Sequence, residues 1–169
     1  KNEVNQLIFS SSCSIYGNPA KLPVNEKTPF GKAESPYARS KQMGEHILKD
    51  FCQSNKDFNV ISLRYFNPVG AHPSGMIGEL PNGVPGNLMP FITQTAAGLR
   101  QQLSVFGDDY NTPDGTAIRD YIHVVDLASA HVKAIDYMQS EKSKEKYQVF
   151  NVGTGNGSSV LEVIQSFER

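Results

Sequence analysis

A tyrosine and a lysine four residues apart are the pair in this sequence with the clearest capacity for chemistry. Tyr37 and Lys41 lie in the stretch SPYARSK, where a serine followed by a proline favours the start of a helix. Residues i and i+4 of a helix share one face, so the lysine ammonium would lie close to the phenol. A nearby ammonium favours the phenolate, which can then act as a base near neutral pH.

Taken alone, this spacing favours a half-buried tyrosine beside a surface lysine, because Tyr-x-x-x-Lys occurs by chance in many helices. Three features favour the acid–base pair: the strand-like run QLIFSSS before it, the Ser-Pro helix start, and the strand-like run LRYFN after it. The hydroxyl of Ser12, at the C-terminal end of the first run, could orient a substrate oxygen against the phenol. Open α/β sheets bind ligands at the carboxyl ends of their strands, which is where Ser12 is expected.

Strand-like and helix-like segments alternate along the chain. Runs rich in β-branched and apolar residues predict strands, and apolar residues at helical spacing predict helices. The alternation predicts an α/β fold with a mostly parallel sheet. Strands are expected over 6–12, 59–67, 103–107, the end of 108–123 and 147–153, and helices over 36–55, 87–102, 124–140 and 158–169. The apolar side of the helix over 124–140 is expected to hold Val124, Leu127, Ala128, Val132, Ile135 and Met138.

Composition and charge disfavour several classes of protein. The 169 residues are enough for one domain or for part of a larger one, and 38% hydrophobic with 20% charged residues is typical of a globular chain. A net charge of −1 gives no electrostatic reason to expect nucleic acid or an anionic membrane as partner. No apolar run approaches the ~20 residues needed to cross a bilayer.

The cysteines and histidines do not indicate a metal or disulfide framework. Cys13 and Cys52 form no CxxC motif, which favours a reducing, cytoplasmic setting. His123 and His131 lie eight residues apart without a cysteine or glutamate in ligand spacing, so no metal site is expected. Cys13 is interpreted as a packed small residue, since no Cys–His arrangement is visible in the sequence.

Several longer motifs accompany the tyrosine and lysine. They are FSSSCSIYG, YARSK, LRYFNPVGAHPSG, GNLMPF, VFGDDYNTPDGTAIRDYIHVVDLA and FNVGTG. Over nearly the whole chain they resemble the extended short-chain dehydrogenase/reductase superfamily, and within it the UDP-hexose 4-epimerases. The segments YFNPVGAHPSG and DGTAIRDYIHVVDLA are highly specific, whereas the Tyr-x-x-x-Lys spacing by itself is not.

The resemblance implies a Rossmann-like, mostly parallel sheet with helices on both faces, plus part of a smaller substrate-binding lobe. Residues 1–66 would form the C-terminal half of the NAD-binding domain, 67–122 mainly the substrate-binding lobe, and 123–169 the return to the Rossmann sheet and the start of the next helix. The family's phosphate-binding turn GxxGxxG is not in this sequence. We therefore expect an internal fragment, truncated at both ends and inactive on its own.

By resemblance, the expected reaction is inversion of C4 of a UDP-hexose, UDP-glucose or UDP-galactose, with NAD as cofactor. Tyr37 would remove the proton of the sugar 4-hydroxyl while hydride passes from C4 to NAD. The 4-keto sugar would turn over, and hydride would return to its other face. Lys41 would favour the phenolate and hold the nicotinamide ribose, and Ser12 would bind the 4-oxygen.

The resemblance also implies two sets of binding residues. The cofactor would contact Ser10, Ser12, Tyr37, Lys41, Tyr65 and Phe66. The UDP-sugar would contact Ser12, Tyr37, Asn67, Asn87, Leu88, Ser104, Val105, Phe106 and Arg119. Within this set, residues 104–106 would surround the uracil and Arg119 would pair with the diphosphate, which suits a guanidinium. A homodimer through the Tyr37 helix is expected on the same ground.

Simpler interpretations stay open for several of these residues. Arg119 could pair with the aspartate that follows it, and Asn67 could form only a turn with the next proline. Asn87 could merely cap the helix that it precedes, and Phe106 could belong to the core.

Three alternative functions fit the sequence less well than the epimerase. Dehydratases of the superfamily usually have Asp-Glu after the catalytic hydroxyl residue, because elimination of water needs a further acid and base; here those positions hold Cys13 and Ser14. A decarboxylase is disfavoured by YFNPVGAHPSG. A non-catalytic module that binds NAD or a nucleotide sugar commonly lacks the tyrosine or the lysine, and this chain has both.

Overall fold

The computed structural model describes residues 4–140 and 145–169, and the chain divides into two compact units. The first unit comprises the residues up to Phe66 together with Asp126–Gly153. The second comprises Asn67–Val125 together with Thr154–Arg169.

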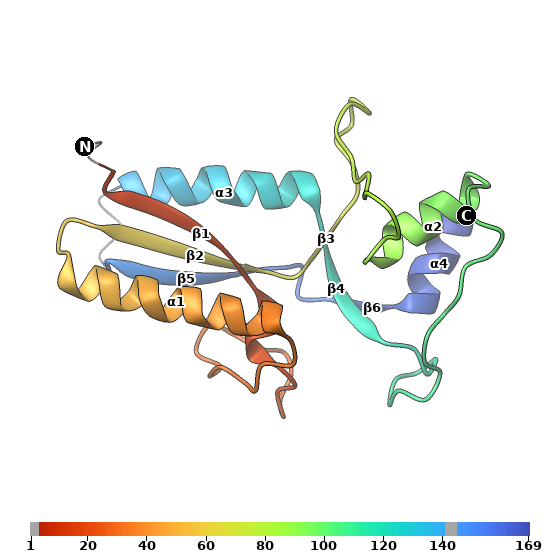
Figure 1. Ribbon diagram of the computed structural model, residues 1–169, viewed down its shortest axis with the longest axis horizontal. Coiled ribbons are helices and arrows are strands. Elements are labelled where there is room, and N and C mark those ends of the chain that lie inside the picture. The colour runs from red at the N-terminus through yellow and green to blue at the C-terminus, as the bar shows by residue number, and fades with distance from the viewer. Residues whose placement is uncertain (1–3, 141–144) are drawn as a thin grey trace. The chain divides into compact units, whose positions relative to one another are not determined.

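In the part of the chain that the structure describes, three parallel strands form the sheet of the first unit. They are β1 (Gln6–Ser12), β2 (Asn59–Tyr65) and β5 (Tyr147–Val152), in the order β1-β2-β5. Ser12 pairs with Tyr65 and Tyr65 with Val152, so the strands end level with one another. Helix α1 (Pro36–Ser54) and helix α3 (Val124–Gln139) lie on opposite faces of the sheet, as Figure 1 shows. This arrangement confirms the predicted fold class.

The face of the sheet under α3 is apolar. Ile61 and Leu63 of β2 are buried against Ala134 and Met138 of α3. Partly buried side chains surround this cluster, namely Ile8, Tyr65, Tyr137 and Val152. The core of the first unit therefore lies between β2 and α3.

The apolar side predicted for α3 is correct at Met138, which is buried, and wrong at Ala128, Val132 and Ile135, which are exposed. Val132 and Ile135 are 58% and 44% exposed. The contact with the sheet is made by Met138 of the predicted side and by Ala134, one helical turn before it, which was not predicted. The buried side of the helix therefore overlaps the predicted side but turns away from Ala128, Val132 and Ile135.

Helix α1 begins where the sequence predicts and ends one residue before the predicted boundary. Ser35 is its N-cap and accepts a hydrogen bond from the backbone N–H of Ala38 at 3.1 Å, while Pro36 occupies the first turn. The side of α1 that is buried in the first unit is partly polar, because it consists of Ala38, Gln42, Glu45 and Cys52.

The second unit contains short strands and two helices. Strands β3 (Asn67–Val69), β4 (Ile118–His123) and β6 (Gly157–Ser159) are arranged in the order β3-β4-β6, with β3 parallel and β6 antiparallel to β4. The helices are α2 (Leu88–Ala96) and α4 (Val160–Glu168). Ser159 caps α4 in a capping box with Glu162.

Three predicted elements differ from the structure. No strand forms over 103–107, although these residues are described, because this run pairs with no described strand and Phe106 is 83% exposed. The helix after Asn87 ends at Ala96 instead of near 102, and Gly98 follows with a φ of 73°, which is typical of a helix end. The run predicted over 59–67 is divided, since β2 ends at Tyr65 and β3 begins in the other sheet.

Asp114 connects a long loop of the second unit to the start of α4. Its Oδ1 accepts hydrogen bonds from the backbone N–H and the hydroxyl of Thr116, at 2.9 and 2.8 Å. Its Oδ2 accepts a hydrogen bond from the hydroxyl of Ser159. The hydrogen bond from Ser159, with those from Thr116, lowers the pKa of the Asp114 carboxyl below its ordinary value.

Asp114→Asn should destabilise the full-length protein that contains this chain, most strongly near neutral pH. Because the pKa of Asp114 is lower in the folded state than in the unfolded state, the stabilisation is present above the ordinary carboxyl pKa, about 4, and is lost as the pH falls through the folded value. Urea unfolding at several pH values would measure this. Asp109→Asn, an exposed carboxylate of the same loop, is the control. A difference between wild type and Asp114→Asn that stays constant down to acid pH would contradict this account.

Candidate active site

The carboxyl end of β1 leads directly into a short helix that is capped by Ser12. This 3-10 helix, η1 (Cys13–Tyr16), follows β1 without a gap. The Ser12 hydroxyl accepts a hydrogen bond from the backbone N–H of Ser14 at 3.2 Å. Since that bond uses the oxygen of Ser12 as acceptor, the hydroxyl proton stays available for donation to another group.

Lys41 extends from α1 to the end of β1. Its Nζ donates a hydrogen bond to the backbone oxygen of Ser10 at 2.8 Å. The same atom lies 5.4 Å from the centroid of the Tyr37 ring and 5.3 Å from that of the Phe9 ring. The ammonium is therefore next to the phenol, on the shared helix face that the four-residue spacing predicts.

Tyr37 lies in the first turn of α1 and is 51% exposed. Its hydroxyl forms no hydrogen bond with the part of the chain that the structure describes, so the phenol is accessible to a ligand. The alternative of a half-buried tyrosine beside a surface lysine fits the exposure of Tyr37 but not that of Lys41, which is partly buried and anchored to Ser10.

The polar groups at this end of β1 suit the hydroxyl groups of a ribose or a hexose. Lys41 uses one of its three N–H donors on Ser10. Ser14 lies beside Ser12, and its hydroxyl is buried without a hydrogen-bond partner among the described residues. A buried hydroxyl of this kind is costly unless a ligand or a water satisfies it. The donor set therefore fits the NAD and nucleotide sugar that the sequence implies.

The predicted cofactor residues are divided between the two faces of the sheet. Lys41 approaches the end of β1 from α1, whereas the Ser10 hydroxyl lies 3.5 Å from Nε2 of His131 on α3. The ring of Tyr65 also lies near His131, with a distance of 6.5 Å between ring centroids. Phe66 is partly buried and donates its backbone N–H to Val152 at 3.1 Å. The structure thus brings Tyr37 and Lys41 together at β1 and places Ser10 and Tyr65 toward α3.

Two predicted substrate residues of the second unit, Asn67 and Asn87, form side-chain hydrogen bonds to other segments of that unit. Asn67 donates from Nδ2 to the backbone oxygen of Asp120 at 2.9 Å, which joins β3 to β4. Asn87 precedes α2 but makes no capping hydrogen bond through its side chain; its Nδ2 donates instead to Glu79 at 3.1 Å. The interpretation of Asn87 as only a helix cap is therefore wrong.

The remaining predicted substrate residues are mostly exposed. Arg119 donates from Nη1 to its neighbour's backbone oxygen at 2.8 Å, and Asp120 accepts its side-chain hydrogen bonds from Thr154 and Gly155. The hydrogen bonds to the Asp120 carboxylate thus come from Thr154 and Gly155, and not from Arg119 as the simpler interpretation suggested. Ser104, Val105 and Phe106 are exposed, so the core interpretation of Phe106 is wrong, and Leu88 is partly buried at the start of α2.

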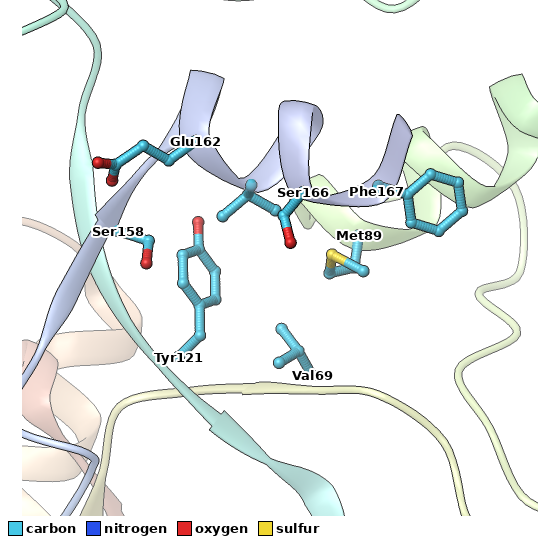
Figure 2. Close-up of a pocket in the computed structure, with 8 residues that line it drawn as sticks. Val69, Met89, Tyr121, Ser158, Glu162, Ser166 and Phe167 are labelled. Carbon is cyan, nitrogen blue, oxygen red and sulfur yellow. The ribbon is translucent and has the colours of Figure 1, made fainter. Parts of the chain in front are cut away.

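A pocket of about 300 Å³ lies within the second unit, close to α4. Figure 2 shows the Tyr121 ring rising from β4 toward the side chains of α4. Burial raises the pKa of Tyr121, so its phenol is neutral near neutral pH. The pocket lining is Val69, Met89, Tyr121, Ser158, Glu162, Val163, Ser166 and Phe167, and it includes none of the predicted substrate residues.

A buried ion pair that was not predicted from the sequence lies beneath α1. Arg64 of β2 and Glu45 of α1 are joined by a contact of 2.6 Å between Nη2 and Oε2. Glu45 follows Lys41 by four residues and Tyr37 by eight. The spacing that relates the tyrosine to the lysine would also have pointed to this glutamate.

Within residues 4–140 and 145–169, no helix is both long enough and apolar enough to cross a membrane. The same residues contain no group of three or more histidine, cysteine, aspartate or glutamate side chains arranged to hold a metal ion.

Comparison with known proteins finds many relatives of one kind. The chain is 54% identical over 166 residues to the UDP-glucose 4-epimerase of Erwinia amylovora, covering 98% of this chain and 48% of that protein. It is 51% identical over 168 residues to the UDP-glucose 4-epimerase of Homo sapiens, covering 98% of this chain and 47% of that protein. The chain thus spans about half the length of the curated relatives that it matches.

Solved structures give the same result. The crystal structure of UDP-glucose 4-epimerase from Bifidobacterium longum in complex with NAD⁺ and UDP matches with a TM-score of 0.91 and 51% identity, over 98% of this chain and 48% of that one. The enzyme from Stenotrophomonas maltophila, with bound NAD and formylated UDP-arabinopyranose, matches with a TM-score of 0.92 and 52% identity, over the same shares.

A family model also matches the chain, over residues 1–153. This match covers most of the sequence, including β1, η1, α1 and the Tyr37–Lys41 pair. The chain therefore belongs to the NAD dependent epimerase/dehydratase family.

Proposed function

We propose that the protein containing this chain is an NAD-dependent epimerase that inverts C4 of UDP-glucose and UDP-galactose. The observation that carries the proposal is the position of Lys41, whose Nζ is anchored to Ser10 at the end of β1 and lies 5.4 Å from the centroid of the Tyr37 ring. Relatives at 51–54% identity that are UDP-glucose 4-epimerases support the choice of reaction.

Each residue at the end of β1 has a defined task in this reaction. NAD, when bound, would supply the acceptor and donor for the hydride of C4. Tyr37 takes the proton of the 4-hydroxyl and later gives it back, which its exposed position in the first turn of α1 permits. Lys41 places a positive charge beside the phenol and favours the phenolate. Ser12 donates its hydroxyl proton to the 4-oxygen, since its own oxygen accepts from Ser14.

Binding is assigned to both units. Ser10, Ser12, Tyr37, Lys41, Tyr65 and Phe66 contact NAD in this proposal. Asn67, Asn87, Leu88, Ser104, Val105, Phe106 and Arg119 contact the UDP-sugar. The exposed guanidinium of Arg119 supports its assignment to the diphosphate, because a planar fork of donors matches phosphate oxygens. The functional division into 1–66, 67–122 and 123–169 stays a prediction.

The residues after Ser12 favour epimerisation over 4,6-dehydration. Elimination of water requires an acid and a base beside the sugar. Cys13 and Ser14, which follow Ser12, have no carboxyl group that could serve as either. A cytoplasmic location belongs to the same proposal, because the two cysteines of the sequence form no CxxC motif.

We also propose that α1 packs against α1 of a second copy to form a homodimer. Met43, Ile47 and Phe51 are spaced four residues apart and are 55%, 64% and 44% exposed. They form an apolar stripe along α1, on a different side from the buried Glu45. Exposed apolar stripes of this kind are typical of protein–protein contacts. In the dimer, the helix bearing Tyr37 would be packed against α1 of the second copy.

Tyr37→Phe should abolish epimerisation by the full-length protein while UDP-sugar binding persists. Loss of the proton acceptor should lower kcat by about 100-fold or more. Product formation and the absorbance of enzyme-bound NADH after addition of UDP-glucose would measure this. Tyr110→Phe is the matched control, because Tyr110 and Tyr37 are 50% and 51% exposed. A wild-type protein that forms neither NADH nor UDP-galactose would contradict the proposed function, and an active Tyr37→Phe variant would remove Tyr37 from its role.

Ile47→Glu should convert the full-length protein from dimer to monomer, because it places a charge in the apolar stripe. Sedimentation equilibrium would give the mass of each species. Gln53→Glu adds the same charge at an exposed position of α1 outside the stripe and should leave the dimer intact. A wild-type protein that sediments as a monomer would disprove the dimer.

A further inference from the structure

We propose that Glu45, Arg64 and Ser11 are positioning residues that fix the register of α1 on β1 and thereby hold Tyr37 and Lys41 at the end of β1. The inference rests on the proposed function, since it concerns the same catalytic pair. The three residues do not touch the substrate in this proposal. They act through the helix and the strand that carry the reacting groups.

The ion pair at the centre of this arrangement is almost completely buried. The side chains of Arg64 and Glu45 are 6% and 2% exposed. Arg64 donates from Nη2 to Oε2 of Glu45 at 2.6 Å and from Nε to Oε1 at 2.9 Å. Such a two-point contact fixes both the distance and the orientation of the partners. Loss of one partner would leave a buried charge uncompensated, which is strongly destabilising.

The Glu45 carboxylate is bonded to all three strands of the first unit. In addition to Arg64 of β2, Oε1 accepts a hydrogen bond from the hydroxyl of Ser11 on β1 at 2.5 Å. Oε2 accepts one from the hydroxyl of Tyr147 on β5 at 3.1 Å. Because these donors come from separate strands, the carboxylate has one position relative to the sheet that satisfies them together.

The Arg64 guanidinium extends the same arrangement to η1. Its Nη1 donates to the hydroxyl of Tyr16 at 3.0 Å, and that hydroxyl donates to Oδ1 of Asn151 at 2.6 Å. Burial by itself lowers the pKa of Arg64, but the hydrogen bonds to Glu45 and Tyr16 outweigh it and the pKa is raised. Burial raises the pKa of Tyr16 and of Tyr147, so both phenols remain neutral donors.

The catalytic pair lies on the same side of α1 as this carboxylate. Tyr37, Lys41 and Glu45 follow one another at intervals of four residues, so they lie along one face of the helix. Lys41 bonds to Ser10 and Glu45 bonds to Ser11, two successive residues that directly precede Ser12. A slide of α1 along β1 would break both contacts, so the register that serves Lys41 is the register that Glu45 fixes.

Close approach of α1 to β1 is also built into the helix. A Cβ atom added at Gly44 would lie 2.6 Å from Cζ of the Phe9 ring, which is closer than packed atoms allow. Apolar contacts of this kind bring the two elements together but tolerate small displacements. The directional bonds of Glu45 do not tolerate them, so they select one register from those that packing permits.

Ser11→Ala in the full-length protein tests the proposal without breaking the ion pair. We expect kcat for epimerisation to fall about tenfold, because a small displacement of α1 misaligns the reacting groups, while KM stays within about twofold. The single-turnover rate of NADH formation should fall by the same factor. Ser62→Ala is the matched control, since Ser62 and Ser11 are both fully buried strand serines but Ser62 reaches the Glu45 carboxylate only through the Tyr147 hydroxyl and not directly. It should lose comparable stability and keep kcat within about twofold.

Equal kcat values for wild type and Ser11→Ala, or equal losses in Ser11→Ala and Ser62→Ala, would overturn the positioning role and leave the epimerase proposal intact. A wild-type protein without epimerase activity would instead overturn the proposed function. Glu45→Gln, which keeps the side-chain volume, should lower kcat more than Ser11→Ala in protein that is folded by circular dichroism. A folded Glu45→Gln variant with wild-type kcat would also overturn the inference.

Discussion

The buried ion pair between Glu45 and Arg64 is the interaction on which the rest of the first unit depends. Its carboxylate is bonded to β1, β2 and β5, and it projects from the helix that carries Tyr37 and Lys41. An apolar replacement of similar volume can be as stable as a buried ion pair, so stability alone does not explain such an arrangement. What the charged pair adds is a single orientation of the helix on the sheet.

The two faces of the sheet therefore contribute to the structure in different ways. Under α3, Ile61 and Leu63 pack against Ala134 and Met138 and bury apolar surface, which drives folding without fixing direction. Under α1, buried polar groups are paired with one another, which fixes direction. The proposed reaction needs the second property, because proton transfer from a sugar hydroxyl to Tyr37 depends on the placement of the phenol relative to Ser12 and the charge of Lys41.

Local signals predicted the local structure well, and contacts between distant segments explain the misses. Ser35 and Pro36 mark the start of α1, and Ser159 caps α4, because capping depends on a few neighbouring residues. The run over 103–107 has strand-forming residues but no partner strand, and strand propensity counts only where a partner exists. Helical spacing in 124–140 predicts an apolar side, but the contact with the sheet determines which of its residues are buried. The Tyr37–Lys41 contact could be predicted from the four-residue spacing. The contact between Glu45 and Arg64 could not, because the two residues are 19 positions apart on different elements.

A double-mutant cycle between Glu45→Gln and Arg64→Gln in the full-length protein tests the central claim most directly. Either single substitution leaves a buried group without its partner, and the double substitution removes both charges. If the pair acts as one unit, the combined loss in kcat and in the free energy of unfolding will be far smaller than the sum of the single losses, with a coupling of about 2 kcal/mol or more. Losses that simply add would contradict the account, because the two side chains would then contribute independently.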